Sequence, residues 1–414
     1  MREEIKKDAG VIIDRSIAAV LPDEAVRRTL TGRDFGDGRV VLAAAGKAAW
    51  QMANTAYEVM GERIESGVVI TKYGHAKGPI GRFRVFEAGH PVPDEGSYVA
   101  TQAALGMVED LTEKDTVIFL LSGGGSALFE SPLISPKSLT LLTEELLKCG
   151  ADITEINTIR KRLSRVKGGR FALACSPAKV LSVVLSDIIG DPLDMIASGP
   201  AYPDRSTCKE AMAIAAKYHL TITAEMELYL SQETPKELSN VETYVNGSVR
   251  SLVRAAADAA ASLGYQPTIL TDCLDCEARE AGRFLAAVAR THTDTSRSLA
   301  FIAGGETIVH LTGTGRGGRN QEIALAGGIG ITGLTHTAIF SVGSDGTDGP
   351  TDAAGGYVDG ETFEVDGAVV TIAEAKAALM NNDAYPLLKK AGGLIITGPT
   401  GTNVNDVSVV LIKR

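Results

Sequence analysis

Short apolar runs rich in β-branched residues alternate with alanine-rich segments of helical periodicity along almost the whole chain. This alternation is typical of strand–helix units that build parallel sheets, and it predicts an α/β fold. The helical pattern predicts helices over 48–60, 97–109, 136–147 and 249–263, the third with Ser135 as N-cap and Pro136 at its first position. Apolar runs predict strands over 39–43, 67–70, 84–87, 116–121, 179–185, 268–271, 299–303, 338–342, 394–397 and 407–412.

The length of 414 residues exceeds what one ordinary hydrophobic core accommodates, so we expect more than one domain. The segment 231–246 is polar and lacks a periodic apolar face. We therefore predict an N-terminal Rossmann-like α/β domain over 1–238 and a C-terminal α/β domain over 239–414, both with mainly parallel sheets. Ligands of open α/β sheets bind beyond the carboxyl ends of the strands, where the glycine-rich loops of this chain lie. We expect the active site in a cleft between the two domains.

Composition narrows the class of protein. The net charge of −10 argues against broad nucleic-acid binding, and no apolar run approaches the roughly 20 residues that span a bilayer. The N-terminus lacks the pattern of a signal peptide, and the odd number of five cysteines favours a reducing cytoplasm. We expect a cytoplasmic protein with small-molecule ligands, no nucleic-acid or membrane partner, and either a monomeric or a homodimeric state.

The glycine-rich segment 341–356 follows an apolar run and contains almost no side chain that packing would require. Three carboxylates within it, at the end of a strand, suit a magnesium ion that keeps most of its waters. The structural alternative is a turn whose Asp side chains cap their own backbone. Three acids in succession favour function, and the predicted metal ligands here are Asp345, Asp348 and Asp352.

A second acidic loop follows the apolar run 183–185. Asp187 and Asp191 lie four residues apart around a glycine turn, so that one carboxylate is placed to bind magnesium and the other to act as a general base. Turn capping is again the alternative. We assign Asp191 to the metal.

Anion-binding signals follow two other strands. Lys47 comes after Gly46 at the start of a helix, where backbone N–H groups also attract anions, although Val41 and Ala48 exclude a Walker A loop. A surface lysine at a turn is the alternative. Consecutive glycines after the run 117–121 predict a nest of backbone amides for a phosphate or a carboxylate, formed by Ser122, Gly123, Gly124, Gly125 and Ser126.

Basic residues concentrate at 160–170 and 316–319 of this acidic chain. Arg160 or Lys161 would neutralise a polyphosphate or a substrate carboxylate, although a solvated charged face is an equal alternative. Gly313, Gly315 and Gly318 match a dinucleotide pattern, but Ala338 stands where a ribose-binding acid would follow. Arg319 at a helix start is the best candidate for stabilising transferred phosphoryl charge. The other predicted binding residues of this region are Glu306, Gly315, Gly317, Gly318 and Asn320.

One lysine, a glycine nest, a glycine–arginine loop and two acidic loops are what phosphoryl transfer requires. The residues alone therefore predict a non-Walker kinase of a small substrate.

The chain also resembles the glycerate 2-kinases that carry a C-terminal MOFRL domain. Matching motifs run in order over nearly the whole chain: A-G-K-A at 45–48, E-A-G-H-P at 87–91, L-S-G-G-G-S-A at 121–127, N-T-I-R-K at 157–161, L-S-D to G-D-P at 185–192, G-G-E-T at 304–307, G-G-R-N-Q-E at 317–322, the loop 343–355, and T-G-P-T-G-T-N-V at 397–404.

The resemblance implies phosphorylation of D-glycerate to 2-phosphoglycerate with ATP and Mg²⁺. It implies that Lys47 and Arg319 contact the substrate and the transferring phosphoryl group, and that the loop 122–126 binds an anionic group. Asp187 is then the base, or the residue that orients the attacking hydroxyl. Two alternatives stay open: an NAD(P)H-dependent hydroxypyruvate reductase, and a non-catalytic sensor of a phosphorylated sugar or acid.

Overall fold

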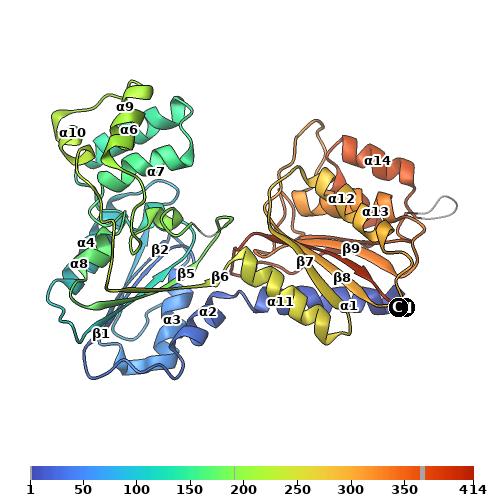
Figure 1. Cartoon of the computed structure of the whole chain (residues 1–414), viewed down its shortest axis with the longest axis horizontal. Coiled ribbons are helices and arrows are strands. Elements are labelled where there is room, and N and C mark those ends of the chain that lie inside the picture. The colour runs from blue at the N-terminus through green and yellow to red at the C-terminus, as the bar shows by residue number, and fades with distance from the viewer. Residues whose placement is uncertain (1, 191, 364–368) are drawn as a thin grey trace. The chain divides into compact units, whose positions relative to one another are not determined.

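The computed structural model describes residues 2–190, 192–363 and 369–414, which form two compact units (Figure 1). The N-terminal unit contains residues 25–186 and 192–246, and the C-terminal unit contains residues 2–24, 187–190 and 247–414. No helix in the described part of the chain combines the length and the apolar character that crossing a bilayer requires.

The N-terminal unit is built on a six-stranded sheet in the order β3-β2-β1-β4-β5-β6. Its strands are β1 (Val40–Ala45), β2 (Ser66–Lys72), β3 (Arg84–Ala88), β4 (Thr116–Leu121), β5 (Lys179–Leu185) and β6 (Val241–Gly247). The pairs from β3 to β5 are parallel, and β1 and β4 are buried over their whole length. Such continuous burial is why these strands read as apolar runs.

Two groups of helices accompany this sheet. One group comprises α2 (Pro22–Leu30), which precedes β1, and the helices α3 (Ala49–Met60), α4 (Glu95–Val108), α5 (Gly125–Leu128) and α8 (Arg170–Ala174), which lie between later strands. The others pack around their own apolar cluster, which includes Leu146 and Ile159, and Figure 1 shows them as a separate group above the sheet. They are α6 (Pro136–Lys148), α7 (Ile153–Arg162), α9 (Cys208–Lys217) and α10 (Ala224–Leu230).

The C-terminal unit contains a six-stranded sheet in the order β11-β10-β9-β12-β8-β7. β7 and β8 are parallel, whereas β12 is antiparallel to both of its neighbours, and β10 is antiparallel to β9 and β11. The strands are β7 (Gln266–Leu274), β8 (Leu299–Gly305), β9 (Thr337–Gly343), β10 (Gly355–Asp359), β11 (Leu394–Ile395) and β12 (Asp406–Ile412).

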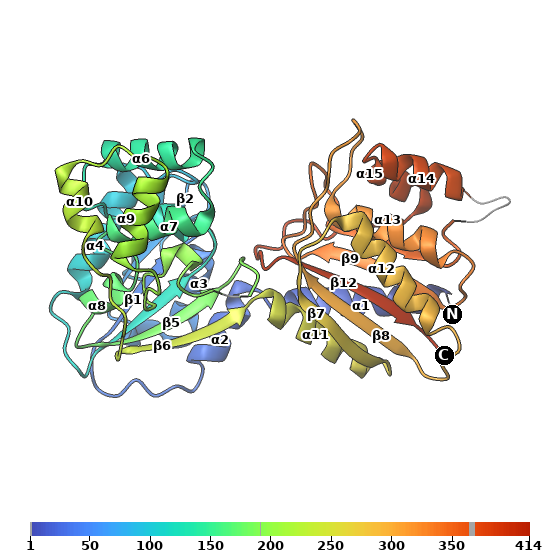
Figure 2. The same cartoon turned by 45° about the horizontal axis from the view of Figure 1, so that its top comes forward.

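Helices cover both faces of this second sheet, as two views show (Figure 1, Figure 2). On one face lie α1 (Arg2–Ala18) and α11 (Val249–Ser262), which pack on Phe340 and Val409. On the other face Ile339 and Val410 join a second cluster with the remaining helices. These are α12 (Ala278–Thr291), α13 (Arg319–Ile331), α14 (Ile372–Met380) and α15 (Ala384–Ala391).

The α/β class is confirmed, and the two sheets taken together are mostly parallel, as predicted. The antiparallel pairs of β10 with β9 and β11, and of β12 with β8 and β9, make the C-terminal sheet mixed. Two strands escaped the sequence pattern. β6 lies at the sheet edge with most residues half-buried, so the segment had appeared as a polar boundary, and β10 begins with two glycines.

The division of the chain differs from the predicted boundary after residue 238 mainly because the first helix packs on the C-terminal unit. Ile5 and Ile12 of α1 are buried in one apolar cluster with α11 and the sheet. Asp8 of the same helix accepts hydrogen bonds from the Tyr265 hydroxyl at 2.7 Å and from the Lys413 ammonium at 2.6 Å. An amphipathic helix buries its apolar face wherever a complementary surface exists, independent of sequence distance.

Ile12→Ala should therefore destabilise the C-terminal unit by about 2–5 kcal/mol, because it leaves a cavity in that core. Hydrogen exchange followed by mass spectrometry would show faster exchange in α11 and β9 and no change in β1 and β4. Asp14→Ala, at an exposed position of the same helix, is the control. Faster exchange in β1 and β4 instead would mean that α1 stabilises the N-terminal unit, and would contradict this prediction.

Candidate active site

The carboxyl edge of the N-terminal sheet brings Lys47 against the glycine loop. The Lys47 N–H donates to the Gly123 carbonyl at 2.9 Å, and the Ser122 hydroxyl accepts the Ala48 N–H at 3.1 Å. A Cβ at Gly46 would lie 2.1 Å from the Ser122 Oγ atom, so only glycine permits this approach. The structure thus brings together Lys47 and Ser122–Ser126, which were predicted separately.

Buried charges support the glycine loop from behind. The Ser126 carbonyl accepts hydrogen bonds from Arg160 at 3.1 Å and from Lys167 at 2.8 Å. The fully buried carboxylate of Glu130 lies 3.4 Å from each of these cations. Burial lowers the pKa of Lys167 to about 8, against the opposing charge of Glu130. Arg160 therefore anchors the loop, a role that the basic cluster alone did not indicate.

Histidines that the sequence interpretation had not selected face the same loop. A Cβ at Gly124 would lie 3.0 Å from Cδ2 of His90 and 3.3 Å from Cγ of Lys47. His75 contacts the Lys47 carbonyl through Nδ1 at 3.1 Å. Burial, followed by the charges of Lys47, Lys72 and His75, lowers the pKa of His90. We call Lys47, Lys72, His75 and His90 the cationic edge; its positive charge comes from the two lysines, because the lowered pKa of His90 favours the neutral imidazole.

The sequence did contain a signal for this edge. Lys72 ends β2, His75 follows it, and His90 comes two residues after β3. The rule that ligands bind beyond the carboxyl ends of strands would have selected them alongside Lys47.

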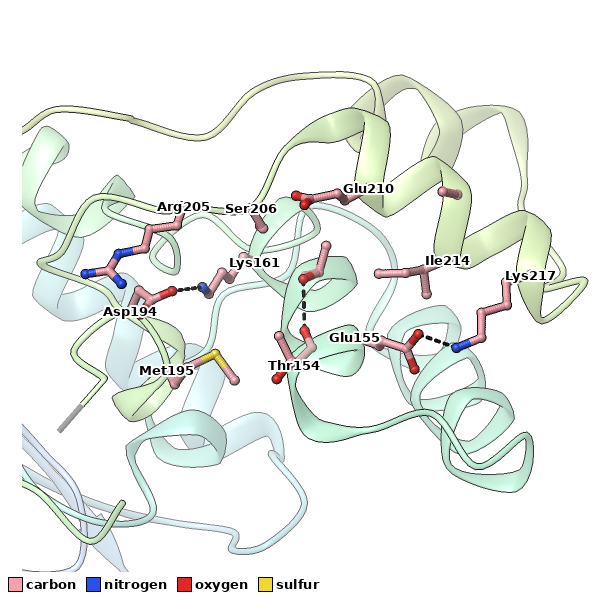
Figure 3. A pocket seen from close by; sticks show the side chains of 12 residues that line it. Thr154, Glu155, Lys161, Asp194, Met195, Arg205, Ser206, Glu210, Ile214 and Lys217 are labelled. Atoms are coloured by element: carbon pink, nitrogen blue, oxygen red, sulfur yellow. Dashed lines mark hydrogen bonds and ion pairs between the residues drawn. The ribbon is translucent and has the colours of Figure 1, made fainter. Parts of the chain in front are cut away.

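Lys161 lies elsewhere in the N-terminal unit, beside a pocket of about 620 Å³ between α7 and α9 (Figure 3). Its side chain is 2% exposed, and its ammonium pairs with Asp204 at 3.0 Å and Asp194 at 3.4 Å. Removing a cation from the buried carboxylate of Asp204 and the half-buried one of Asp194 is costly. This pairing favours a structural role for Lys161 over the predicted contact with a substrate anion.

The three carboxylates of the loop 341–356 have three different environments. Both oxygens of Asp348 accept N–H groups at the start of α13, from Asn320 at 3.1 Å and Gln321 at 2.9 Å. Asp345 accepts the Thr347 N–H at 2.8 Å, and the exposed Asp352 accepts the Tyr385 hydroxyl at 2.6 Å. Asp348 therefore caps a helix, and a shared metal site of all three carboxylates is not what the structure contains.

Within the described ranges, no three or more His, Cys, Asp or Glu side chains are arranged to hold a metal ion. Asp191 lies outside the described residues, and Asp187 is half-buried beyond β5. Mg²⁺ commonly binds one or two carboxylates together with substrate phosphates and water. The half-buried Asp345 suits that arrangement, whereas the described part of the chain shows no protein cage of the kind that calcium requires.

The glycines at 313–318 are explained by packing. The N–H groups of Gly313 and Gly315 donate to Asn382 Oδ1 and to the Asn381 carbonyl, both at 2.9 Å. Asp383 Oδ1 accepts the Arg316 N–H at 2.8 Å. A Cβ at Gly315 would lie 2.4 Å from Cβ of Asp383. These amides already have partners, so they form no pyrophosphate cradle, and the predicted phosphate contact of Gly315 has no free amide to make it.

Gly317 and Gly318 lie where α13 meets the loop that contains Asp348. A Cβ at Gly318 would lie 2.3 Å from Cγ of Asp348, and a Cβ at Gly349 would lie 2.3 Å from the Gly317 carbonyl oxygen. Asn320 is fully buried and accepts the Ser341 hydroxyl at 2.5 Å. These residues hold the start of the helix and leave its first side chain, Arg319, 31% exposed.

Arg319 is surrounded by acids. Its Nε and Nη2 atoms bind Asp406 at 2.6 and 3.1 Å, and its Nη1 atom binds Glu306 at 2.9 Å. Burial opposes the charge of Arg319, but the hydrogen bond and charge of Asp406 outweigh it and raise the pKa of the guanidinium. Asp406 was not among the predicted site residues.

Comparisons with known proteins show which families the chain resembles. Residues 8–231 match a domain of unknown function, DUF4147, and residues 299–406 match the MOFRL family. The chain is 52% identical to a D-glycerate 2-kinase of Thermotoga maritima over 99% of both chains. It is 40% identical to a glycerate 2-kinase of Pyrococcus horikoshii, over 92% of this chain and 89% of that one.

A crystal structure of a glycerate kinase from Thermotoga maritima superimposes with a TM-score of 0.92, covering 99% of this chain and 100% of the other at 52% identity. The chain belongs to the glycerate 2-kinase family with a C-terminal MOFRL domain. The resemblance noted from the sequence motifs is confirmed, and so is the prediction that this chain is an enzyme of the kinase class.

In this glycerate 2-kinase family member, Lys47→Met should raise the pKa of His90, because it removes one of the positive charges that disfavour protonation of the imidazole. The pKa is measured by NMR titration of isotopically labelled histidines. Lys114→Met, at the opposite edge of the same sheet, should leave the titration unchanged. An unaltered His90 pKa in Lys47→Met would mean that the two side chains do not share the cationic edge.

Asp348→Asn should destabilise the protein by about 1–3 kcal/mol, since the amide can no longer accept both N–H groups of α13. Unfolding is measured in the absence of Mg²⁺ and nucleotide, with Asp345→Asn as the comparison. If Asp348 were chiefly a metal ligand, its loss would matter only when Mg²⁺ is present.

Proposed function

We propose that this protein transfers the γ-phosphoryl group of ATP to the 2-hydroxyl of D-glycerate and releases 2-phosphoglycerate and ADP. The observation that carries the proposal is the cationic edge beside the glycine loop in an otherwise acidic protein. Both substrates are anions, and a local group of cations gives them a favourable potential that the net charge of −10 does not.

The chemistry assigns simple tasks to the residues at this edge. The 2-hydroxyl oxygen forms a bond to the γ-phosphorus while the bond to the β,γ-bridging oxygen breaks, and the hydroxyl proton passes to Asp187 or to water. A loose transition state places charge on the equatorial oxygens, so positioned cations stabilise it more than a base does. We assign Lys47 and Arg319 to the phosphoryl oxygens and Ser122–Ser126 to an anionic group.

We include Mg²⁺ because it neutralises polyphosphate charge in such reactions. Asp345 is the described carboxylate that best suits it, and Asp191 keeps its predicted role. Asp187 as the base, the shared cleft and the cytoplasmic location also stay predictions.

The reductase alternative depended on the dinucleotide pattern at Gly313–Gly318. In the loop with this pattern, the N–H groups of Gly313, Gly315 and Arg316 donate hydrogen bonds to residues 381–383. That use of the amides favours the kinase over a nicotinamide-dependent enzyme.

The first test is ADP formation from ATP, Mg²⁺ and D-glycerate, with the product identified by phosphorus NMR. We expect a 2-phosphoglycerate signal that disappears when Mg²⁺ is removed. A 3-phosphoglycerate signal would reject the 2-hydroxyl. Absence of turnover, together with fluorescence enhancement of NADH on binding, would favour the reductase.

Lys47→Ala should lower kcat by about 10²–10³-fold, as the loss of a transition-state donor does. Asp187→Asn should lower kcat less, because the hydroxyl proton leaves late. Lys114→Ala at the opposite sheet edge controls for the loss of one surface cation. Equal losses in the first two variants would contradict the ranking, and loss of affinity with an unchanged rate in Lys47→Ala would indicate a sensor.

A further inference from the structure

Because β12 runs antiparallel to β8 and β9, its first residue, Asp406, lies at the edge of the sheet where those two strands end. In register, Asp406 pairs with both Gly305, the last residue of β8, and Gly343, the last residue of β9. The first residue of β12 thus lies between the starts of the loops that contain Glu306 and Asp345. A search restricted to residues that follow strands misses Asp406.

The contact between Asp406 and Arg319 is a bidentate ion pair, at 2.6 and 3.1 Å. Such fork-to-fork pairs fix the plane of the guanidinium as well as its position. The Asp406 side chain is only 6% exposed, and both of its register partners are glycines. A Cβ at Gly343 would lie 3.3 Å from Asp406 Oδ1. The sheet therefore holds the carboxylate rigidly.

Glu306 differs from Asp406 in every one of these respects. It binds Arg319 through Nη1 alone, at 2.9 Å, and its side chain is 47% exposed. Exposed ion pairs of this kind contribute little stability, typically about 0–1 kcal/mol. An anionic ligand that approaches Arg319 meets Glu306 on its outer nitrogen, while Asp406 occupies the inner two.

We propose that Asp406 is the positioning residue that orients Arg319 for phosphoryl transfer. In the absence of substrate, Glu306 binds the Nη1 atom of Arg319, and an anionic group of the substrate replaces Glu306 there. This inference rests on the proposed function. Asp406 acts only through Arg319 and touches neither substrate. Glu306, predicted as a binding residue, then competes with the substrate anion for Arg319.

The experiment compares kcat and KM of full-length variants with ATP, Mg²⁺ and D-glycerate. Asp406→Asn should lower kcat by about ten- to a hundredfold, as the loss of a charge-assisted hydrogen bond does. Glu306→Gln should lower the KM for one of the anionic substrates, because a competing charge is removed.

The matched control is Asp359→Asn. Asp359 forms a comparable pair with Arg2, with Nε and Oδ2 2.8 Å apart, in the same unit. Its register partner is Ala338 at the start of β9, which places it at the opposite edge of the sheet. This variant should keep kcat within about twofold of wild type. A similar loss of kcat in both Asp→Asn variants would reduce the role of Asp406 to general stability.

Chemical rescue keeps the inference testable if Asp406→Asn does not fold. Guanidinium ion added to Arg319→Ala should restore part of the rate, because Asp406 offers it the same bidentate partner. Saturable rescue in Arg319→Ala, with less rescue in Arg319→Ala/Asp406→Asn where that variant folds, supports positioning. No rescue, or an increased KM in Glu306→Gln, overturns the inference. Absence of wild-type turnover rejects the proposed function instead.

Discussion

Buried carboxylates require donors, and this requirement determines the shape of both candidate loops. Glu130 is fully buried and lies 3.4 Å from Arg160 and Lys167, which in turn hold the Ser126 carbonyl. In the C-terminal unit, Asp348 accepts the first N–H groups of α13 and so sets where Arg319 emerges. An unpaired charge in either place would cost several kcal/mol, so the donors cannot move away freely.

The same requirement separates side chains that hold other parts of the protein in place from side chains that remain available to a ligand. Arg160, Lys161 and Asp348 are cationic or acidic side chains in loops or helices of predicted function, yet each is engaged by a buried partner. Lys47 is exposed at the end of β1 and keeps its ammonium at the cationic edge. An acidic protein can thus present positive charge where an anion binds while its other cations are neutralised internally.

The sequence predicted the fold well where burial is continuous. β1 is apolar at every position and β4 at every position after Thr116, and such runs are not mistaken for exposed loops. The edge strand β6 was missed because partial exposure gives it a mixed pattern. The packing of the first helix on the C-terminal unit was not predictable, since its partners Tyr265 and Lys413 lie hundreds of residues away and periodicity does not identify them.

The proximity of candidate site residues was predictable when it depended on adjacent strands and not when it depended on contacts between segments far apart in the sequence. The juxtaposition of Lys47 and the glycine loop follows from adjacent parallel strands. The topology is needed to see that Asp348 caps a helix 28 residues earlier, or that Asp406 reaches this edge of the sheet from an antiparallel strand.

The most direct test of the account is a crystal structure with ADP, Mg²⁺, D-glycerate and a planar metal-fluoride mimic of the phosphoryl group. The account predicts the mimic within hydrogen-bond distance of Lys47 Nζ and the guanidinium of Arg319. A mimic bound beside Lys161, or at neither cation, would contradict it.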